Sequence, residues 1–240
     1  MRDSERIDDP RRALLVGLLA AGAYLLPRPL RAGPLGDVPQ PLSAGRSIYS
    51  MSGSVQVNGV AASSSTLIRA GDVVETGAAS RVVFAVGKDA FLLREQSRLE
   101  LAREEGSAAG ELLVGALRLF TGKLLSVFGK HAHAFHTPTA TIGIRGTGVY
   151  AEIEPDRTYF CTCYGVTDVG VADDPNARET VSATHHDARW ILASGSERIR
   201  RAPFVNHTDE ELALIEALVG RTPPFVMPGA GYGAPRRSEY

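Results

Sequence analysis

The sequence predicts an all-β protein: a single domain of short, mainly antiparallel strands, arranged as a β-roll, sandwich or solenoid, with one C-terminal α-helix. Apolar residues alternate with period two, and turn residues interrupt them every eight to twelve positions or so. Glycine accounts for 25 of 240 residues, which favours turn-rich β structure over a helical bundle. Asn58-Gly59 lies between two alternating segments, and this dipeptide is a strong signal for a hairpin.

The expected strands follow one another from Ser47 onward. They cover residues 54–57, 60–61, 73–77, 81–86, 90–93, 99–101, 112–119, 141–144, 149–153 and 158–164. The composition of 112–119 would also suit a helix. Gly115, Gly122 and the β pattern on both sides favour a strand instead.

The helix is predicted from its boundary signals. Thr208 is suited to cap its N-terminus, Glu211 completes a capping box three residues later, and Gly220 ends it. Its apolar stripe consists of Leu212, Ile215 and Val219, with Glu216 beside it. We expect this stripe to pack on the β-domain of the same chain, the alternative being a partner protein.

The N-terminus carries an uncharged apolar run, residues 13–26, directly after Arg11-Arg12. As a helix this run would span about 21 Å, less than the roughly 30 Å hydrocarbon core of a membrane. It has the length of the apolar region of a secretory signal peptide. We therefore expect residues 1–32 to be a secretory or twin-arginine signal peptide and the mature protein to be periplasmic. Contact with a membrane is expected only through an uncleaved signal segment.

Charge and motifs restrict the function classes. The formal net charge of -1 argues against a nucleic-acid-binding protein, which would carry a basic excess. The sequence contains no nucleophile elbow, zinc-protease motif or phosphate-binding glycine loop, so we expect no enzyme. The expected organisation is a linker at 33–46, a β-domain at 47–203, the helical segment at 204–220 and a flexible tail at 221–240.

Two tracts carry a family resemblance. GDVVETG at 71–77 and TPTATIGIRGT at 137–147 stand in the order of a known module. With them, residues 50–175 resemble the FecR domain, the periplasmic β-module of iron-dicitrate sensor regulators. The motif residues are Gly71, Asp72, Thr76, Gly77, Ile144, Arg145, Gly146 and Thr147.

The resemblance implies the fold and a structural role for these motif residues. Gly71, Gly77, Gly146 and Gly148 would provide positive φ or close strand approach, and Arg145, if buried, would need backbone carbonyls as acceptors. It does not imply sigma-factor regulation, because only about a dozen residues precede the apolar run where the regulators carry a folded domain. We expect an exported, non-catalytic module for ligand binding, sensing or protein interaction, with a cell-envelope protein or a small ligand as its partner.

Cys161 and Cys163 are the only cysteines, and strand alternation places them on one face. His185-His186-Asp187 follows about twenty residues later. Two thiolates and two imidazoles are a favoured ligand set for Zn²⁺, and thiolates also suit Cu(I). Neighbouring strand residues point in opposite directions, so His185 and His186 would both bind only if the chain turns there. Asp187 could instead orient one imidazole.

Other interpretations of these residues stay open. The cysteines are also compatible with an inert buried pair. A mutual disulfide would be strained, because Cα atoms two residues apart on a strand are about 6.6 Å apart, and a disulfide to another molecule is a further alternative. His131 and His133 form a second candidate metal-binding pair or a solvated edge. The alternative function is therefore a periplasmic metal-binding or thiol-redox protein that uses Cys161, Cys163, His185 and His186.

Overall fold

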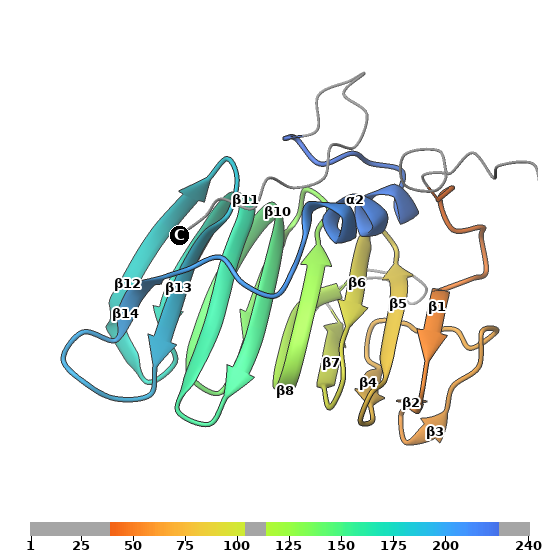
Figure 1. Cartoon of the computed structure of the whole chain (residues 1–240), viewed down its shortest axis with the longest axis horizontal. Coiled ribbons are helices and arrows are strands. Elements are labelled where there is room, and N and C mark those ends of the chain that lie inside the picture. Colours follow the sequence, from red (N-terminus) through yellow and green to blue (C-terminus); the bar gives the residue numbers. More distant parts are fainter. Residues whose placement is uncertain (1–38, 104–113, 226–240) are drawn as a thin grey trace, which may run out of the picture. The chain divides into compact units, whose positions relative to one another are not determined.

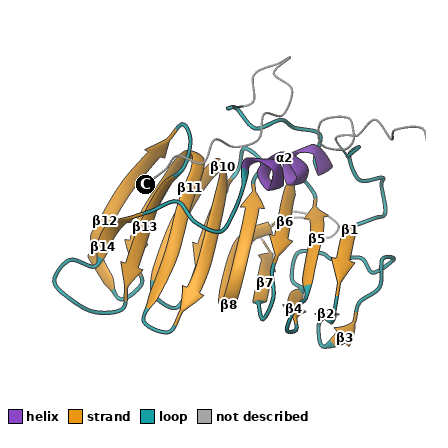
Figure 2. Cartoon of the chain, in the orientation of Figure 1, coloured by secondary structure: helices purple, strands orange, loops and turns teal. Residues whose placement is uncertain are grey.

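A computed structural model describes residues 39–103 and 114–225 (Figure 1). It confirms the all-β prediction, because the described residues form one open, mainly antiparallel sheet of 14 strands together with the helix α2 (Asp209–Leu218) (Figure 2). The predicted signal peptide, residues 33–38 of the predicted linker and most of the predicted tail lie outside the described residues. Among the described helices, none is long and apolar enough to cross a membrane.

Within the described residues the predicted segments all fall on strands, but five further strands were not predicted, at 48–52, 132–136, 174–183, 187–192 and 199–202, and three strands have unexpected length. The strands are β1 (Ile48–Ser52), β2 (Val55–Val57), β3 (Val60–Ala61), β4 (Val73–Thr76), β5 (Arg81–Val86), β6 (Asp89–Leu93), β7 (Arg98–Arg103), β8 (Val114–Val127), β9 (Ala132–His136), β10 (Ala140–Glu154), β11 (Arg157–Val171), β12 (Asp174–Ala183), β13 (Asp187–Leu192) and β14 (Ile199–Ala202). The strands β8, β10 and β11 have 14, 15 and 15 residues. Residues 141–144 and 149–153, predicted as two strands, belong to the single strand β10.

The long strands connect two layers of the sheet. In the layer beside α2, which we call the helix-side layer, the order is β14-β13-β11-β10-β8-β6-β5-β1. In the other, the outer layer, it is β12-β11-β10-β9-β8-β7-β4-β2-β3. β8, β10 and β11 contribute one half to each layer, so the sheet folds over on itself.

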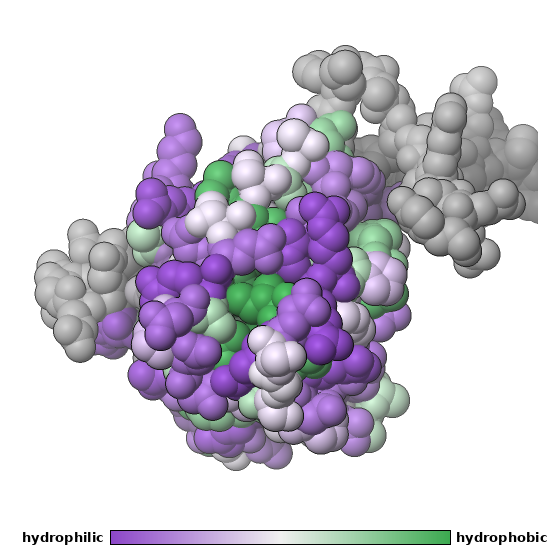
Figure 3. Space-filling model, turned by 90° about the vertical axis from the view of Figure 1, so that its left-hand side faces the viewer, coloured by the Kyte–Doolittle hydropathy of each residue, from purple (hydrophilic) through white to green (hydrophobic). Residues whose placement is uncertain are grey.

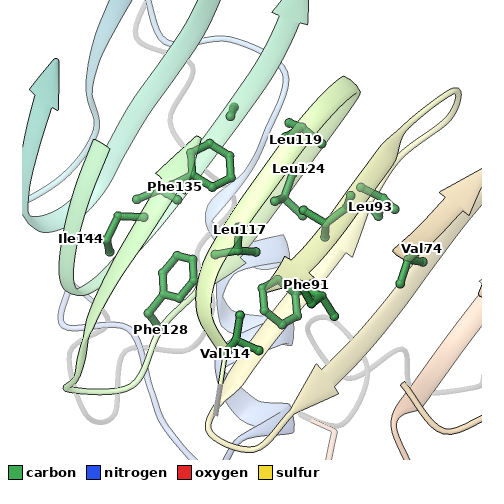
Figure 4. Packing of buried hydrophobic residues seen from close by; sticks show 14 of the residues in the cluster. Val74, Phe91, Leu93, Val114, Leu117, Leu119, Leu124, Phe128, Phe135 and Ile144 are labelled. Atoms are coloured by element: carbon green, nitrogen blue, oxygen red, sulfur yellow. The ribbon is translucent and has the colours of Figure 1, made fainter. Parts of the chain in front are cut away.

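The main hydrophobic core fills the space between these layers (Figure 4). Phe135 in the outer layer and Phe160 in the helix-side layer have ring centroids 5.9 Å apart. Phe91 of β6 and Leu117 of β8 are both fully buried in the same cluster. Apolar residues that alternate along the strands therefore point inward from both layers, as a sandwich requires.

The long strands pass between the layers at irregular positions. The register of β10 against β11 shifts between Arg145 and Gly148. Near this shift Gly146 has φ +56° and Gly165 has φ +91°, conformations that a side chain disfavours. The Gly146 of the FecR-like tract thus lies where β10 changes layers, and such a bulge bends a strand.

Replacing Gly165 with alanine is expected to lower the free energy of unfolding by about 3 kcal/mol, measured by urea denaturation. The alanine would be held at a positive φ, and its Cβ would lie 2.3 Å from Cγ2 of Thr147. Gly59→Ala is the matched control, because Gly59 has φ +77° but no atom within 4 Å of the added Cβ. It should cost only about 1–2 kcal/mol. Equal losses in the two variants would contradict the close packing of Gly165 on Thr147.

The first FecR-like tract lies in the β2–β4 region of the outer layer. Gly71 has φ +100° in the turn before β4. Asp72 accepts hydrogen bonds from the Arg69 backbone N–H at 2.7 Å and from Nδ2 of Asn58 at 2.8 Å. Oγ1 of Thr76 accepts one from the Ser97 backbone N–H at 3.0 Å. A Cβ on Gly77 would lie 3.2 Å from Cβ of Ser54, so the strands approach closely there.

The second tract contains buried residues and one exposed arginine. Ile144 and Thr147 are buried. The side chain of Arg145, however, is 75% exposed and lies 3.9 Å from a carboxylate oxygen of Asp168. The condition under which Arg145 would need backbone acceptors is not met, because strand alternation turns Ile144 inward and Arg145 outward.

The predicted helix boundaries are confirmed. Oγ1 of Thr208 accepts a hydrogen bond from the Glu211 backbone N–H, and a Glu211 carboxylate oxygen accepts one from the Thr208 backbone N–H at 3.0 Å. The helix lies on β5, β6 and β8, as Figure 1 shows. Its buried Leu212, Ile215 and Leu218 join a second apolar cluster on the outside of the helix-side layer. The helix therefore packs on its own β-domain, as predicted.

The sheet ends in β12, β13 and β14 at one side. Figure 3 shows that this end carries mostly hydrophilic side chains around a small hydrophobic area. In β12, six of ten residues are polar or charged and only Val181 is fully buried. Charged side chains on an edge strand oppose pairing with another chain, which protects an open sheet from aggregation.

Candidate metal centre

Strand β11 places both cysteine side chains on the side of the helix-side layer that faces α2. Phe160 points into the main core, and its neighbour Cys161 points the opposite way, into the cluster beneath α2. Cys163 follows on the same face. Both thiols are free and neither residue has measurable exposure.

His186 reaches these thiols because the chain turns directly before β13. The residue has φ +46°, and its backbone N–H donates to the Cys163 carbonyl at 2.9 Å. Its Nδ1 lies 3.7 Å from Sγ of Cys161. The turn separates the two neighbouring histidines, since the His186 side chain is 7% exposed and that of His185 is 50% exposed.

The fourth group is His207, which the sequence analysis did not select. It directly precedes the N-cap of α2 and is buried. Its Nε2 lies 3.3 Å from Sγ of Cys163 and 3.3 Å from Nδ1 of His186. The ligand atoms of Cys161, Cys163, His186 and His207 all lie within 4.8 Å of one another.

These distances fit a tetrahedral metal shell. With Zn–N of about 2.05 Å and Zn–S of about 2.3 Å, a tetrahedron has N–N edges of about 3.3 Å and N–S edges of about 3.5 Å. The observed N–N distance is 3.3 Å, and the two N–S distances are 3.3 and 3.7 Å. The other three distances between ligand atoms are at most 4.8 Å, so the four groups could close around one Zn²⁺ ion.

Neighbouring groups orient both imidazoles for this role. Nδ1–H of His207 donates to the Val205 carbonyl at 2.8 Å, which leaves Nε2 with its lone pair toward the thiols. Nε2–H of His186 donates to a carboxylate oxygen of Asp209 at 2.9 Å, which leaves Nδ1 free. A carboxylate that holds a ligating imidazole is a recurrent arrangement in zinc sites. Asp209 also lies 3.0 Å from Nε2 of His185, so His185 supports the shell from outside it.

The electrostatics of the centre favour a cation. Burial raises the pKa of the Cys161 thiol, but hydrogen bonds with Cys163, His186 and His207 outweigh it and hold that pKa well below its usual range. Burial and the adjacent Cys161 raise the pKa of Cys163. Burial lowers the pKa of His186, but its bonds to Asp209 and Cys161 outweigh this and raise it to about 9. A bound metal would displace protons from such groups, so binding should release them.

Aromatic rings surround the four groups. Tyr150 stacks on His207 with ring centroids 4.3 Å apart. Phe204 lies 4.2 Å from His186 and 4.6 Å from His207 by the same measure. The protein thus offers four ligands and an apolar surround. Such a closed set is typical of structural zinc sites, whereas catalytic sites keep a position for water or substrate.

The remaining histidine and aspartate candidates lie elsewhere. Asp187 forms an ion pair with Arg189. Nδ1 of His133 lies 2.7 Å from the Val114 carbonyl oxygen, so that ring nitrogen is engaged by the backbone. The rings of His131 and His133 have centroids 5.3 Å apart. Of the residues predicted as ligands, the structure brings Cys161, Cys163 and His186 together and places His185 in contact with Asp209 instead.

Comparisons with known proteins give little beyond this geometry. No family model matches the sequence, and no curated protein is similar to it. Two crystal structures of a putative anti-sigma factor from Parabacteroides distasonis are similar in structure, with a TM-score of 0.42 and 8% sequence identity. The similarity covers 54% of this chain and 58% of that one.

Proposed function

We propose that this protein is a non-catalytic regulatory or sensing module whose effector is Zn²⁺, bound by Cys161, Cys163, His186 and His207. The observation that supports it is the convergence of four ligand atoms within 4.8 Å of one another, with both imidazoles oriented by a hydrogen bond on the opposite nitrogen. A full set of four protein ligands favours a binding role over catalysis.

The metal would link the helix to the sheet. Two ligands come from β11, one from the turn before β13, and His207 and the supporting Asp209 come from the start of α2. Metal occupancy would therefore determine how firmly α2 covers the apolar face formed by residues such as Leu92 and Leu125. A partner protein that binds only the docked helix, or only the released helix, would respond to whether the site holds metal.

Export to the periplasm and a FecR-type role are part of the proposal. The apolar run at 13–26 supports export, and the tracts at 71–77 and 137–147 support the family. Cu(I) is the second candidate ion, because two thiolates suit it. Thiol-redox function is the alternative if the two free thiols oxidise in the exported protein.

Metal binding is tested on the purified full chain by elemental analysis and by Co²⁺ titration, in which thiolate ligation produces charge-transfer absorption. We expect one Zn²⁺ per chain. Cys161→Ser and His207→Gln each remove a ligand and should weaken binding by more than about 100-fold, whereas Asp209→Asn removes a supporting group and should weaken it by about 10–100-fold.

His185→Gln is the matched control, because His185 contacts the supporting carboxylate and the ring of His186 but is not one of the four ligands. It should change affinity by less than about tenfold. Unchanged affinity in His207→Gln would show that the fourth ligand is misassigned. A stable Cys161–Cys163 disulfide without metal would refute the proposal and favour the redox alternative, and preferential retention of Cu(I) would replace zinc as the effector.

A further inference from the structure

A cavity of about 1270 Å³ adjoins the metal centre without containing any of its four ligands. Its wall comes from the β5–β6 turn, the loop after β8, the irregular parts of β10 and β11, the segment between β12 and β13, and both ends of α2 with the residues that follow it. Asp209 and His185 lie in this wall. The volume exceeds the range of about 300–1,000 Å³ that is typical of small-molecule sites.

The cavity is lined by two lysines that have no ion-pair partner in the described part of the chain. Two of the three lysines in the chain, Lys88 and Lys130, line it. Neither forms an ion pair within residues 39–103 and 114–225. In contrast, the acidic residues of the wall are already engaged. Glu216 accepts hydrogen bonds from Arg221 and from a tyrosine, and Asp209 contacts two histidines.

An unsatisfied polar atom lies beside these lysines. A Cβ on Gly129 would be 3.3 Å from Cβ of Lys88 and 3.6 Å from both Oδ1 of Asp89 and Cε1 of His131, so these residues flank Gly129. The Asp89 carboxylate already accepts a hydrogen bond from the Gly129 backbone N–H at 2.8 Å. Nε2 of His131 is buried and has no hydrogen-bond partner in the described part of the chain. A buried polar atom without a partner is costly. Because this nitrogen has almost no accessible surface, the ring would turn toward the cavity to meet an oxygen atom of a ligand.

The rest of the wall includes apolar and aromatic groups. Phe128 and Tyr164 are buried, and Phe225 lies edge-on to Tyr164 with ring centroids 5.9 Å apart. Val219 and Pro224 add aliphatic surface. A few convergent polar groups beside an apolar wall are characteristic of a small-molecule site.

We propose that this cavity binds an organic anion. Its carboxylate would meet Lys88, Lys130 and His131, and its apolar or aromatic body would lie against Phe128 and Tyr164. This inference rests on the cavity alone and does not depend on the metal-sensing function.

The probe is 2-naphthoate, with the neutral 2-naphthalenemethanol as its analogue of similar shape. Each is titrated into the full chain by calorimetry at low and high salt, and zinc content is measured separately on the same sample. We expect saturable binding of 2-naphthoate that is about tenfold tighter than that of the alcohol and weakens with salt. The double variant Lys88→Gln/Lys130→Gln should lose this tenfold preference and leave the affinity for the alcohol unchanged.

Lys123→Gln is the matched control. Lys123, the third lysine, lies outside the cavity and its Nζ is 3.5 Å from a carboxylate oxygen of Glu95. It should bind both probes as the wild type does. Equal affinity for the two probes, or an unchanged preference in the double variant, would overturn the proposal. Because zinc content is measured independently, neither result would bear on the metal centre.

Discussion

Chelation of the metal is expected to lower the thermal unfolding midpoint by about 8–16 °C. An ion that binds only the folded state at a free concentration 1,000 times its dissociation constant stabilises that state by about 4 kcal/mol. For a chain of 150–250 residues, each kcal/mol corresponds to about 2–4 °C. The experiment compares zinc-loaded protein with the same sample after treatment with a strong chelator, by differential scanning calorimetry.

The matched control for chelation is the double variant Cys161→Ser/Cys163→Ser. Serine is close to cysteine in size but does not supply a thiolate, so the variant should melt at one temperature with or without the chelator. Adding zinc back to the chelated wild-type protein should restore its original unfolding midpoint. A wild-type midpoint that chelation leaves unchanged would contradict a structural contribution from zinc, whatever its affinity.

Chelation should also act unequally across the fold. Amide hydrogen exchange is expected to accelerate in α2 well before it accelerates in β6, because α2 is joined to the sheet at its N-terminus by His207 and Asp209. Strand β6 is paired on both sides, with β5 and β8, and lies in the main core. Regions of low local stability open first. Uniform acceleration would instead indicate that the metal stabilises the domain as one unit.

Local signals predicted much of the fold. Asn58-Gly59 forms the expected hairpin between β2 and β3, residues 81–86 are a strand with the predicted bounds, and Thr208 caps the helix. The weak points were strands with little alternation. Strand β12 was missed because only Val181 of its ten residues is fully buried, so its sequence lacks an apolar period. In β10, Gly146 looked like a break between two strands, whereas it is a bulge within one.

The alternation of side chains along a strand predicted only part of the metal centre. The spacing of Cys161 and Cys163 was enough to place both on one face. The turn at His186 was not evident, since a non-glycine residue at φ +46° leaves no clear signal in the sequence. His207 was inaccessible to spacing arguments, because it lies 44 positions after Cys163 and reaches it only when α2 docks. Its position next to a well-marked N-cap was the one available sign.

The end of α2 offers the second large effect. The Glu216 side chain is only 4% exposed, and Nε of Arg221 donates to its carboxylate at 2.6 Å. The Tyr164 hydroxyl donates to the other oxygen, and burial together with Glu216 raises the pKa of this phenol, so it stays a donor. Glu216 was expected beside the apolar stripe of the helix. It lies instead within the buried face, where its charge needs a partner.

Arg221→Leu is therefore expected to lower the free energy of unfolding by about 3–5 kcal/mol, measured by urea denaturation, because it leaves a buried carboxylate without its counter-charge. The double variant Glu216→Leu/Arg221→Leu removes both charges and should be more stable than Arg221→Leu by about 2 kcal/mol or more. A matched surface control is Arg118→Leu, because its ion-pair partner Glu100 is more exposed than Glu216. This substitution should lower the free energy of unfolding by under about 1 kcal/mol. If the double variant were no more stable than Arg221→Leu, the loss of stability in Arg221→Leu would come from the missing packing of the arginine. It would not come from the unpaired Glu216 carboxylate.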